Sequence, residues 1–282
     1  MVKRKWHKVL YMDQGVPDNY VDKSFLDEMK KNVNTRTYEL WSVIRETGVV
    51  SQQLSSICFF VVIFIYMDSA VLTPSHLLTV SSIVTVLGYI LYDLVDWGAE
   101  RRKSQRSRAA DVKTTLIFMT FTYGLSPILQ TLTDTISTDT IYAMTVFMLL
   151  GSLLFHDYGT DAIVASRSLS LNASVFASVC LASRLPTSMH TFATVTLAMQ
   201  LFALWPELRR KLKRQLPNCQ YIMTWGSASI ALASLLSIST SAGVCFALVH
   251  LAITYLVPLC LISLQPYKNN IHGPWDEAVI QH

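Results

Sequence analysis

The sequence predicts an all-α, polytopic integral membrane protein with about eight transmembrane helices and both termini in the cytosol. Of its 282 residues, 51% are hydrophobic and only 15% are charged, and the mean hydropathy is +0.37. The apolar residues gather in stretches of about 16–23 residues, close to the roughly 20 that a helix needs to cross a bilayer. The eight stretches are residues 49–67, 76–95, 114–132, 140–155, 162–182, 189–206, 221–239 and 242–264.

The positions of the Lys and Arg residues predict the orientation. Segments on one side of the stretches hold 21 of the 23 Lys and Arg residues. These segments are residues 1–48, 96–113, 156–161, 207–220 and 265–282. The gaps on the other side hold only Arg184, and Arg167 lies inside a stretch. Because cytoplasmic loops retain positive charge, the segments on the basic side are expected to be cytosolic. The net charge of +4 lies next to the membrane, which indicates contact with anionic lipids and no nucleic-acid partner.

The chain divides by this pattern into three parts. Residues 1–48 form a cytosolic N-terminal arm, residues 49–264 an eight-helix transmembrane domain, and residues 265–282 a cytosolic C-terminal tail. Within the transmembrane domain, residues 96–113 and 207–220 form basic cytosolic loops.

Local patterns add detail to four of the predicted helices. A Ser or Thr in the link "DTISTDT" is expected to cap the fourth helix. The fifth stretch, "SLSLNASVFASVCLAS", is rich in Ser and Ala, and such small residues let helices approach closely in lipid. The last two stretches are separated by little more than Ser239–Ser241, so they are expected to form a tight helical hairpin.

Two carboxylates and two arginines form a candidate site for a lipid headgroup at the cytosolic leaflet. Asp93 and Asp96 are three residues apart and share a helix face, and Arg101 and Arg102 follow closely. Arginine can hold a lipid phosphate, while a carboxylate can accept hydrogen bonds from hydroxyl groups of a headgroup. The alternative is that both carboxylates are interfacial and are neutralised by the basic loop.

A second polar cluster, His156, Asp157 and Asp161, lies in a loop on the same side. It could act as a general acid and base, or it could be the ordinary polarity of a helix end. Arg167 is expected to reach the cytosolic interface or to pair with Asp161. His250, inside the last stretch, is expected to be a packed polar contact rather than a ligand.

The sequence predicts no catalytic residue, no metal site and no cofactor. The five cysteines are scattered without a C-x-x-C pair, and no G-x-G-x-x-G, P-loop, H-E-x-x-H or G-x-S-x-G motif occurs. A nucleotide-sugar pocket normally needs an α/β domain, and the longest predicted cytosolic piece has only 48 residues.

Several longer stretches resemble the PIG-C family, one of the subunit families of phosphatidylinositol N-acetylglucosaminyltransferase. They are "PDNYVD" at 17–22, "TFTYGLSPIL" at 120–129, "STDTIYAMTVFMLLG" at 137–151, "SLNASVFASVCLASRLP" at 170–186, "FALWP" at 202–206 and "NIHGPWDEA" at 270–278. The resemblance runs from about residue 6 to residue 278. The extreme N-terminus and the loop near 97–112 match least well.

The resemblance implies a role in the first step of glycosylphosphatidylinositol (GPI) anchor synthesis. In that family, a complex on the cytosolic face of the endoplasmic reticulum transfers N-acetylglucosamine from UDP-N-acetylglucosamine to phosphatidylinositol. The glycosyltransferase fold belongs to another subunit, PIG-A. The other implied partners are PIG-Q, PIG-H, PIG-P, PIG-Y and a dolichol-phosphate-mannose synthase regulatory subunit. This chain is thus expected to be a multi-pass, non-catalytic subunit that scaffolds the complex and helps to present the lipid.

The C-terminal tail is a candidate partner-docking element, carried by His272, Pro274, Trp275, Asp276 and Glu277. A Gly-Pro turn would present an aromatic anchor beside two acidic residues, and Trp is a frequent hot-spot residue at interfaces. The alternative is a tail that folds back on its own helices.

Two other classes of function remain open from the sequence. One is a small-molecule transporter, which would need polar residues along a path at mid-depth in the membrane, and the sequence supplies few. The other is a membrane-embedded lipid transferase that acts alone. For such an enzyme, only the groups around Asp93 and His156 are available.

Overall fold

The computed structural model describes residues 15, 30–31, 37–95, 107–133, 135–158, 166–268 and 271–272. Apart from two short strands, its regular elements are helices. The helices are α2 (Leu40–Asp68), α3 (Pro74–Leu94), α5 (Arg108–Thr131), α6 (Thr138–Phe155), α7 (Arg167–Ala182), α8 (Ser188–Met199), α9 (Trp205–Gln215), α10 (Cys219–Leu236), α11 (Thr240–Leu251) and α12 (Val257–Leu264). The all-α class is therefore confirmed.

Two π-helical turns each join two α-helices into one longer, continuous helix. The first, η1 (Gln200–Leu204), joins α8 to α9, and the second, η2 (Ala252–Leu256), joins α11 to α12. Pro206 and Pro258 follow these turns. Because proline lacks a backbone N–H, the regular bonding of an α-helix is interrupted there.

Each of the eight predicted stretches lies on helix, with residues 162–165 of the fifth outside the described residues. Within the part of the chain that the structure describes, four helices are long and apolar enough to cross a membrane. They are Leu40–Asp68, Pro74–Leu94, Thr138–Phe155 and Thr240–Tyr267. Helix α7 has 16 residues, short of the roughly 20 required. Eight crossings and cytosolic termini therefore stay predictions.

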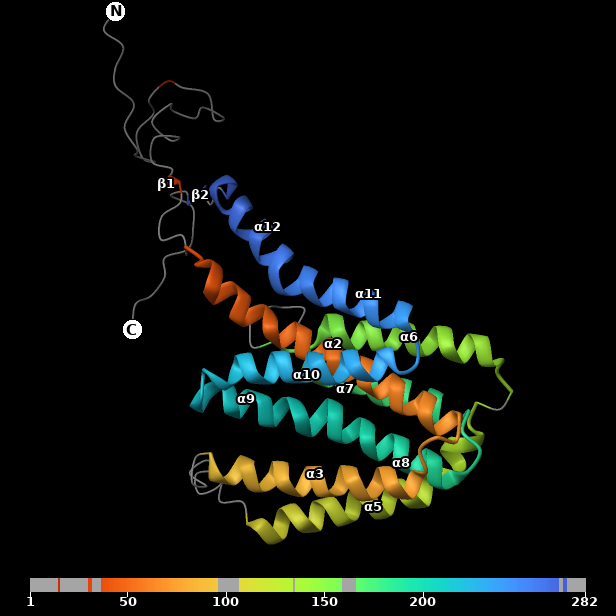
Figure 1. Ribbon diagram of the computed structural model, residues 1–282. Coiled ribbons are helices and arrows are strands. Elements are labelled where there is room, and N and C mark those ends of the chain that lie inside the picture. Colours follow the sequence, from red (N-terminus) through yellow and green to blue (C-terminus); the bar gives the residue numbers. More distant parts are fainter. Residues whose placement is uncertain are drawn as a thin grey trace, which may run out of the picture. The chain divides into compact units, whose positions relative to one another are not determined.

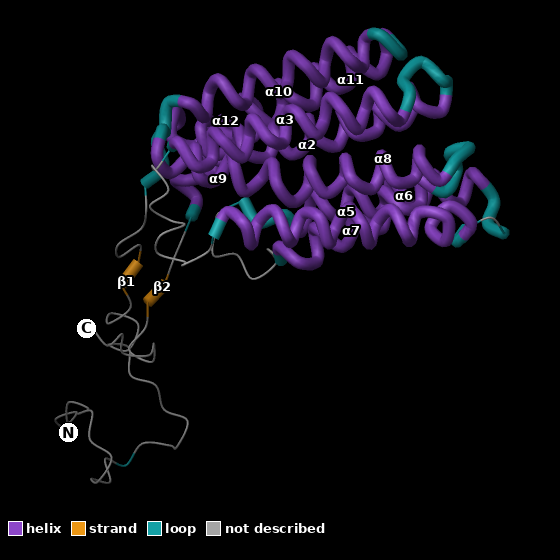
Figure 2. The backbone as a smooth tube through the Cα atoms, turned by 90° about the horizontal axis from the view of Figure 1, so that it is seen from below, coloured by secondary structure: helices purple, strands orange, loops and turns teal. Residues whose placement is uncertain are grey.

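The chain forms two compact units. The first comprises Met1–Leu40 with Leu259–His282. In it, strand β1 (Lys30–Lys31) pairs antiparallel with β2 (Ile271–His272). The two strands are drawn in orange in Figure 2. The backbone N–H of Tyr38 donates to Gln265 Oε1 at 3.3 Å, next to the short 3₁₀ helix η3 (Gln265–Tyr267).

The second unit, Trp41–Pro258, holds the hydrophobic core. Figure 1 shows its helices running alongside one another. The core is centred on Phe60, Phe64 and Met67 of α2, and residues of α3, α6, α7, α8 and η1 pack around them. The rings of Phe60 and Phe202 meet edge to face, with centroids 5.5 Å apart. In a bilayer, close packing of such side chains and hydrogen bonds between helices hold the unit together, because lipid tails are as apolar as the buried side chains.

Helices α6 and α7 pack closely through small polar residues, as the Ser- and Ala-rich sequence predicts. The hydroxyl oxygens of Ser152 and Ser174 lie 2.7 Å apart, and Ser170 Oγ donates to the backbone carbonyl of Ser152 at 2.8 Å. The predicted cap is also present, since Ser137 Oγ accepts from the backbone N–H of Thr140 at the start of α6.

The predicted hairpin of the last two stretches is confirmed. Helix α10 ends at Leu236, α11 begins at Thr240, and the two helices pack together. A Cβ added at Gly243 would lie 2.5 Å from Leu236 Cδ2, so a larger residue at this position would require the Leu236 side chain to move.

A large apolar surface of the second unit is exposed. On α3, only 6% of the most apolar window is buried inside the protein, and Val80, Val84 and Leu87 are among its exposed residues. A contiguous exposed apolar surface of this kind indicates contact with a membrane or a partner.

Candidate functional site

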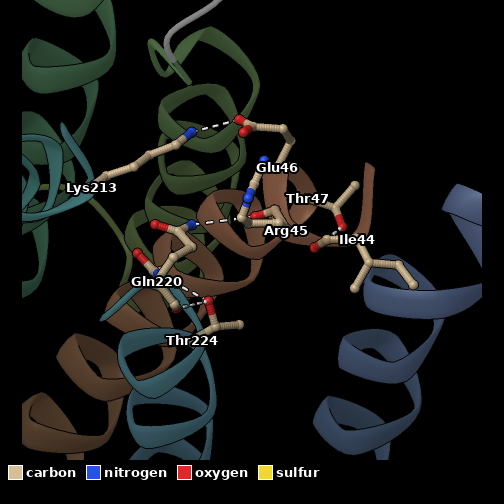
Figure 3. A network of polar contacts seen from close by, with 8 residues as sticks. Ile44, Arg45, Glu46, Thr47, Lys213, Gln220 and Thr224 are labelled. Carbon is tan, nitrogen blue, oxygen red and sulfur yellow. Dashed lines mark hydrogen bonds and ion pairs between the residues drawn. The ribbon is translucent and has the colours of Figure 1, made fainter. Parts of the chain in front are cut away.

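The basic segments of the second unit meet at one end of its helices. Four contacts join them. Three are ion pairs: Lys213 Nζ lies 2.5 Å from Glu46 Oε2, Arg210 Nη2 lies 3.1 Å from Asp157 Oδ2, and Arg108 Nη2 lies 3.2 Å from Asp93 Oδ2. The fourth is a cation–π contact, in which Lys211 Nζ lies 3.6 Å from the centroid of the Tyr92 ring. Figure 3 shows the first contact, beside the hydrogen bond from Gln220 Nε2 to the carbonyl of Arg45.

The opposite ends of the helices are joined by different contacts. Arg184 donates to the carbonyl and the hydroxyl of Thr133, and Ser188 Oγ donates to Gln130 Oε1 at 2.8 Å. Tyr66 and Ser237 also share a hydrogen bond there. The segments that the charge pattern assigns to one side of a membrane thus lie together, and so do segments assigned to the other side.

The candidate headgroup site is described at one of its four residues. Asp93 lies in the last turn of α3 and pairs with Arg108, the first residue of α5, while its side chain is 13% exposed. Asp96, Arg101 and Arg102 lie outside the described residues.

The candidate docking tail is described only by the backbone of one residue. His272 belongs to β2 and pairs with Lys30 of β1. Pro274, Trp275, Asp276 and Glu277 lie outside the described residues.

The second polar cluster is described at two of its three residues. His156 and Asp157 follow α6 directly, whereas Asp161 lies outside the described residues. Arg167 is the first residue of α7 and forms an ion pair with Glu207 at the start of α9. Its partner is therefore a residue about forty positions further along the chain, which α9 brings to the end of α7.

The centre of this region is Arg209, whose side chain is almost completely buried. Only 4% of the residue is exposed. Its Nη2 donates to Gln53 Oε1 at 2.8 Å, and its Nη1 donates to Gln52 Oε1 at 3.4 Å. Gln52 in turn donates from Nε2 to Thr224 Oγ1 at 2.8 Å. Two glutamines of α2 thus hold a guanidinium of α9 and tie it to α10.

The positive charge of Arg209 faces neutral partners. Among the described residues, no carboxylate lies within ion-pair distance of its guanidinium, because Glu207 and Asp157 pair with Arg167 and Arg210. Its Nε has no hydrogen-bond partner, and neither does Nε2 of Gln53. A buried cation without a counter-ion is costly, so this arrangement marks the strongest functional candidate in the described chain.

Burial and charge shift the titration of the neighbouring groups. Burial, reinforced by Arg209, lowers the pKa of His156 to about 4. Burial raises the pKa of Tyr158, and Arg209 partly opposes that rise. Burial lowers the pKa of Arg209 to about 10, so that its guanidinium is still protonated at neutral pH. His156 is consequently neutral at neutral pH, beside the cations Arg209, Arg210 and Arg167.

Acidification is expected to destabilise the second unit through His156. Its folded pKa of about 4 lies below the ordinary value of 6.5, so between these pH values the unfolded chain binds a proton that the folded chain does not. Stability should fall by at most about 1.4 kcal/mol for each pH unit below about 6.5. Unfolding in mixed detergent micelles at several pH values measures this slope. The variant His156→Gln should flatten it, and an equal slope in variant and wild type would contradict the assignment.

Sequence reasoning missed Gln52, Gln53 and Arg209 as one site. The two glutamines lie in an otherwise apolar stretch, and Arg209 lies in a segment interpreted as interfacial. Polar amides in an apolar stretch are the signal that could have found them, because such groups need partners inside the protein.

His250 is packed as predicted, but the predicted polar contact is absent among the described residues, because neither ring nitrogen has a hydrogen-bond partner. It is 4% exposed, and its ring lies 5.4 Å from that of Trp225 and 5.9 Å from that of Phe246, centroid to centroid. These contacts are with aromatic rings of α10 and α11, and they do not involve Arg167, Arg209 or Arg210.

The fold and the site define a class. Apart from two short strands, the described chain is helical, and four of its helices are long and apolar enough to cross a bilayer. A polar cluster that contains Arg167, Arg209 and Arg210 lies at one end of the helices. A sequence model of the phosphatidylinositol N-acetylglucosaminyltransferase family (GPI2) matches residues 6–276. This chain belongs to that family.

Curated relatives match over nearly the whole chain. The human PIG-C protein, named as a subunit of phosphatidylinositol N-acetylglucosaminyltransferase, is 54% identical over 277 residues, covering 98% of this chain and 93% of the relative. A Dictyostelium discoideum protein, named as the putative equivalent subunit of the same transferase, is 38% identical over 99% of this chain and 81% of the relative. The GPI2 subunit of Schizosaccharomyces pombe is 34% identical over 99% of this chain and 87% of the relative. No solved structure matches significantly.

Proposed function

We propose that this chain is a non-catalytic membrane subunit of the complex that transfers N-acetylglucosamine from UDP-N-acetylglucosamine to phosphatidylinositol. The observation that carries the proposal is the identity of 54%, over 98% of the chain, to a relative named as a subunit of this transferase. The helical fold supports the non-catalytic assignment, since a nucleotide-sugar pocket normally belongs to an α/β domain. The chain would scaffold the complex in the first step of GPI-anchor synthesis.

The proposed setting is the endoplasmic reticulum membrane, crossed eight times with both termini in the cytosol. The contacts between the basic segments at one end of the helices support this topology, because cytoplasmic loops retain Lys and Arg. The proposed partners are PIG-A, PIG-Q, PIG-H, PIG-P, PIG-Y and the dolichol-phosphate-mannose synthase regulatory subunit. PIG-A would supply the catalytic fold.

The experiment that tests this function removes the chain from cells. Transfer of labelled N-acetylglucosamine from UDP-N-acetylglucosamine to phosphatidylinositol is then measured in microsomes. Loss of product, restored by the wild-type chain, supports the proposal. Undiminished product would overturn it and favour a transporter. Activity of the purified chain by itself would favour the other alternative, a lipid transferase that acts alone.

The headgroup site at Asp93, Asp96, Arg101 and Arg102 is part of this proposal. Replacing Asp93 and Asp96 by Asn should lower transfer while the complex still assembles. Because Asp93 pairs with Arg108, the variant Arg108→Gln is the matched control, breaking the same ion pair without removing a carboxylate. If Arg108→Gln lowers transfer equally, or if assembly falls in parallel with activity, the carboxylates are structural.

The tail at His272, Pro274, Trp275, Asp276 and Glu277 is proposed to dock one of the other subunits. Deletion of residues 270–282 should reduce co-purification of those subunits. Normal co-purification of the shortened chain would count against docking.

A further inference from the structure

The donors around Arg209 outnumber the acceptors. Its guanidinium has five N–H donors, of which two positions are used by Gln52 and Gln53, while Nε has no partner. Next to it, Nε2 of Gln53 is also buried without a partner. Both unsatisfied atoms are donors, and they belong to residues that already contact each other. Among the described residues, no acceptor is bonded to either of these two donors, since the buried Oε1 of Glu207 lies in the ion pairs with Arg167 and Arg210.

Among the described residues, the cations around Arg209 also outnumber the carboxylates. Three guanidinium groups, those of Arg167, Arg209 and Arg210, face the two carboxylates of Asp157 and Glu207. Both carboxylates pair with the outer arginines, so the positive charge that is left over resides on the innermost one. The side chain of Arg167 is 58% exposed and that of Arg210 is 26% exposed, whereas Arg209 is buried.

We propose that Arg209 and Gln53, with Arg210 at the entrance, bind the phosphate group of an anionic ligand. A phosphate oxygen would accept from Arg209 Nε and Gln53 Nε2, and its charge would balance the buried guanidinium. Arginine presents a planar array of donors that matches phosphate oxygens. The neighbouring His156 ring carries no negative charge that would repel the ligand.

If the proposed function is right, two ligands of the complex contain such a phosphate group. One is the phosphodiester of an inositol phospholipid, and the other is the diphosphate of a sugar nucleotide. The location at the basic end of the helices suits both, because a headgroup and a soluble nucleotide reach a membrane protein at that level. The binding experiment below separates them, and it does not depend on transfer activity.

The test uses the purified full chain in phosphatidylcholine nanodiscs. Binding of short-chain phosphatidylinositol, UDP-N-acetylglucosamine and inorganic phosphate is measured separately by calorimetry. Saturable binding of at least one probe is expected, weakened by more than about tenfold in Arg209→Gln, because the guanidinium supplies charge-assisted hydrogen bonds that a neutral amide does not. The matched control is Arg214→Gln, which removes an exposed positive charge from the same helix and should leave the affinity within about twofold.

The variant Gln53→Glu distinguishes loss of the binding site from loss of the fold. It places a carboxylate beside Arg209 in almost the same volume, so it should raise the unfolding midpoint without ligand and abolish phosphate binding. Binding of the lipid alone assigns the site to the headgroup, and binding of the nucleotide alone assigns it to the diphosphate. Binding of all three probes means that the phosphate suffices.

Two results would overturn the proposal. One is that no probe binds to the wild-type chain. The other is that Arg209→Gln and Gln53→Glu both bind as the wild type does, in which case Arg209 only ties α2 to α9. The proposed function fails by a different result, undiminished transfer in microsomes that lack the chain, so the two failures can be told apart.

Discussion

Replacing both Gln52 and Gln53 by leucine is expected to lower the free energy of unfolding by about 3–5 kcal/mol, because the double change leaves the buried guanidinium of Arg209 without hydrogen-bond acceptors. Leucine is similar in size to glutamine, so the effect is mainly that of a stranded charge rather than of a cavity. Unfolding of the purified chain in mixed detergent micelles, followed by tryptophan fluorescence, measures it.

The third substitution Arg209→Met provides the decisive control. In the triple variant no cation remains to be stranded, so most of the lost stability should return. A residual cost of about 1 kcal/mol is expected, since Gln52 also donates to Thr224 Oγ1 at 2.8 Å. Gln215→Leu, at an exposed position of α9, should change stability little. If the triple variant is as unstable as the double one, the charge of Arg209 is not the cause.

The helices of this fold could be predicted from the sequence because their signal is local. Each apolar stretch lies on helix, and the hairpin around Ser239–Ser241 and the cap at Ser137 follow from short-range rules. The grouping of basic segments at one end of the helices also agrees with the alternation of charge along the chain. Length and hydropathy alone could not establish how many helices cross a membrane, since α7 is short and α9 continues α8.

The site could not be predicted because its residues are brought together by packing. Gln52 and Arg209 are 157 positions apart, and their contact depends on how α9 lies against α2. The mean hydropathy of an apolar stretch stays high even when it contains two glutamines, such as Gln52 and Gln53. A count of basic residues does not distinguish an exposed arginine from a buried one. Arg167 illustrates the same point, since its partner is Glu207 on another helix.

Helices α2 and α10 approach each other closely at Gly48, and enlarging this residue is expected to be strongly destabilising. A Cβ at Gly48 would lie 2.7 Å from Thr224 Oγ1. This hydroxyl has little freedom to move, because it donates to the carbonyl of Gln220 at 2.9 Å and accepts from Gln52. Figure 3 shows Gln220 and Thr224 on α10 facing the start of α2. Helices that approach so closely depend on small residues at the contact.

Gly48→Leu should therefore lower the free energy of unfolding by about 3 kcal/mol, as expected for overpacking of a tight contact. The matched control is Gly226→Leu on α10, where an added Cβ meets nothing within 4 Å, and it should be neutral or slightly stabilising. Combining Gly48→Leu with Thr224→Ala should recover part of the loss, because the obstructing hydroxyl is gone. Equal damage from both glycine variants would mean that helix flexibility, not the contact, is what glycine provides. Thr224 Oγ1 accepts a hydrogen bond from Gln52, which in turn accepts one from Arg209. Gly48→Leu should therefore also disturb the proposed phosphate site at Arg209 and weaken phosphate binding there.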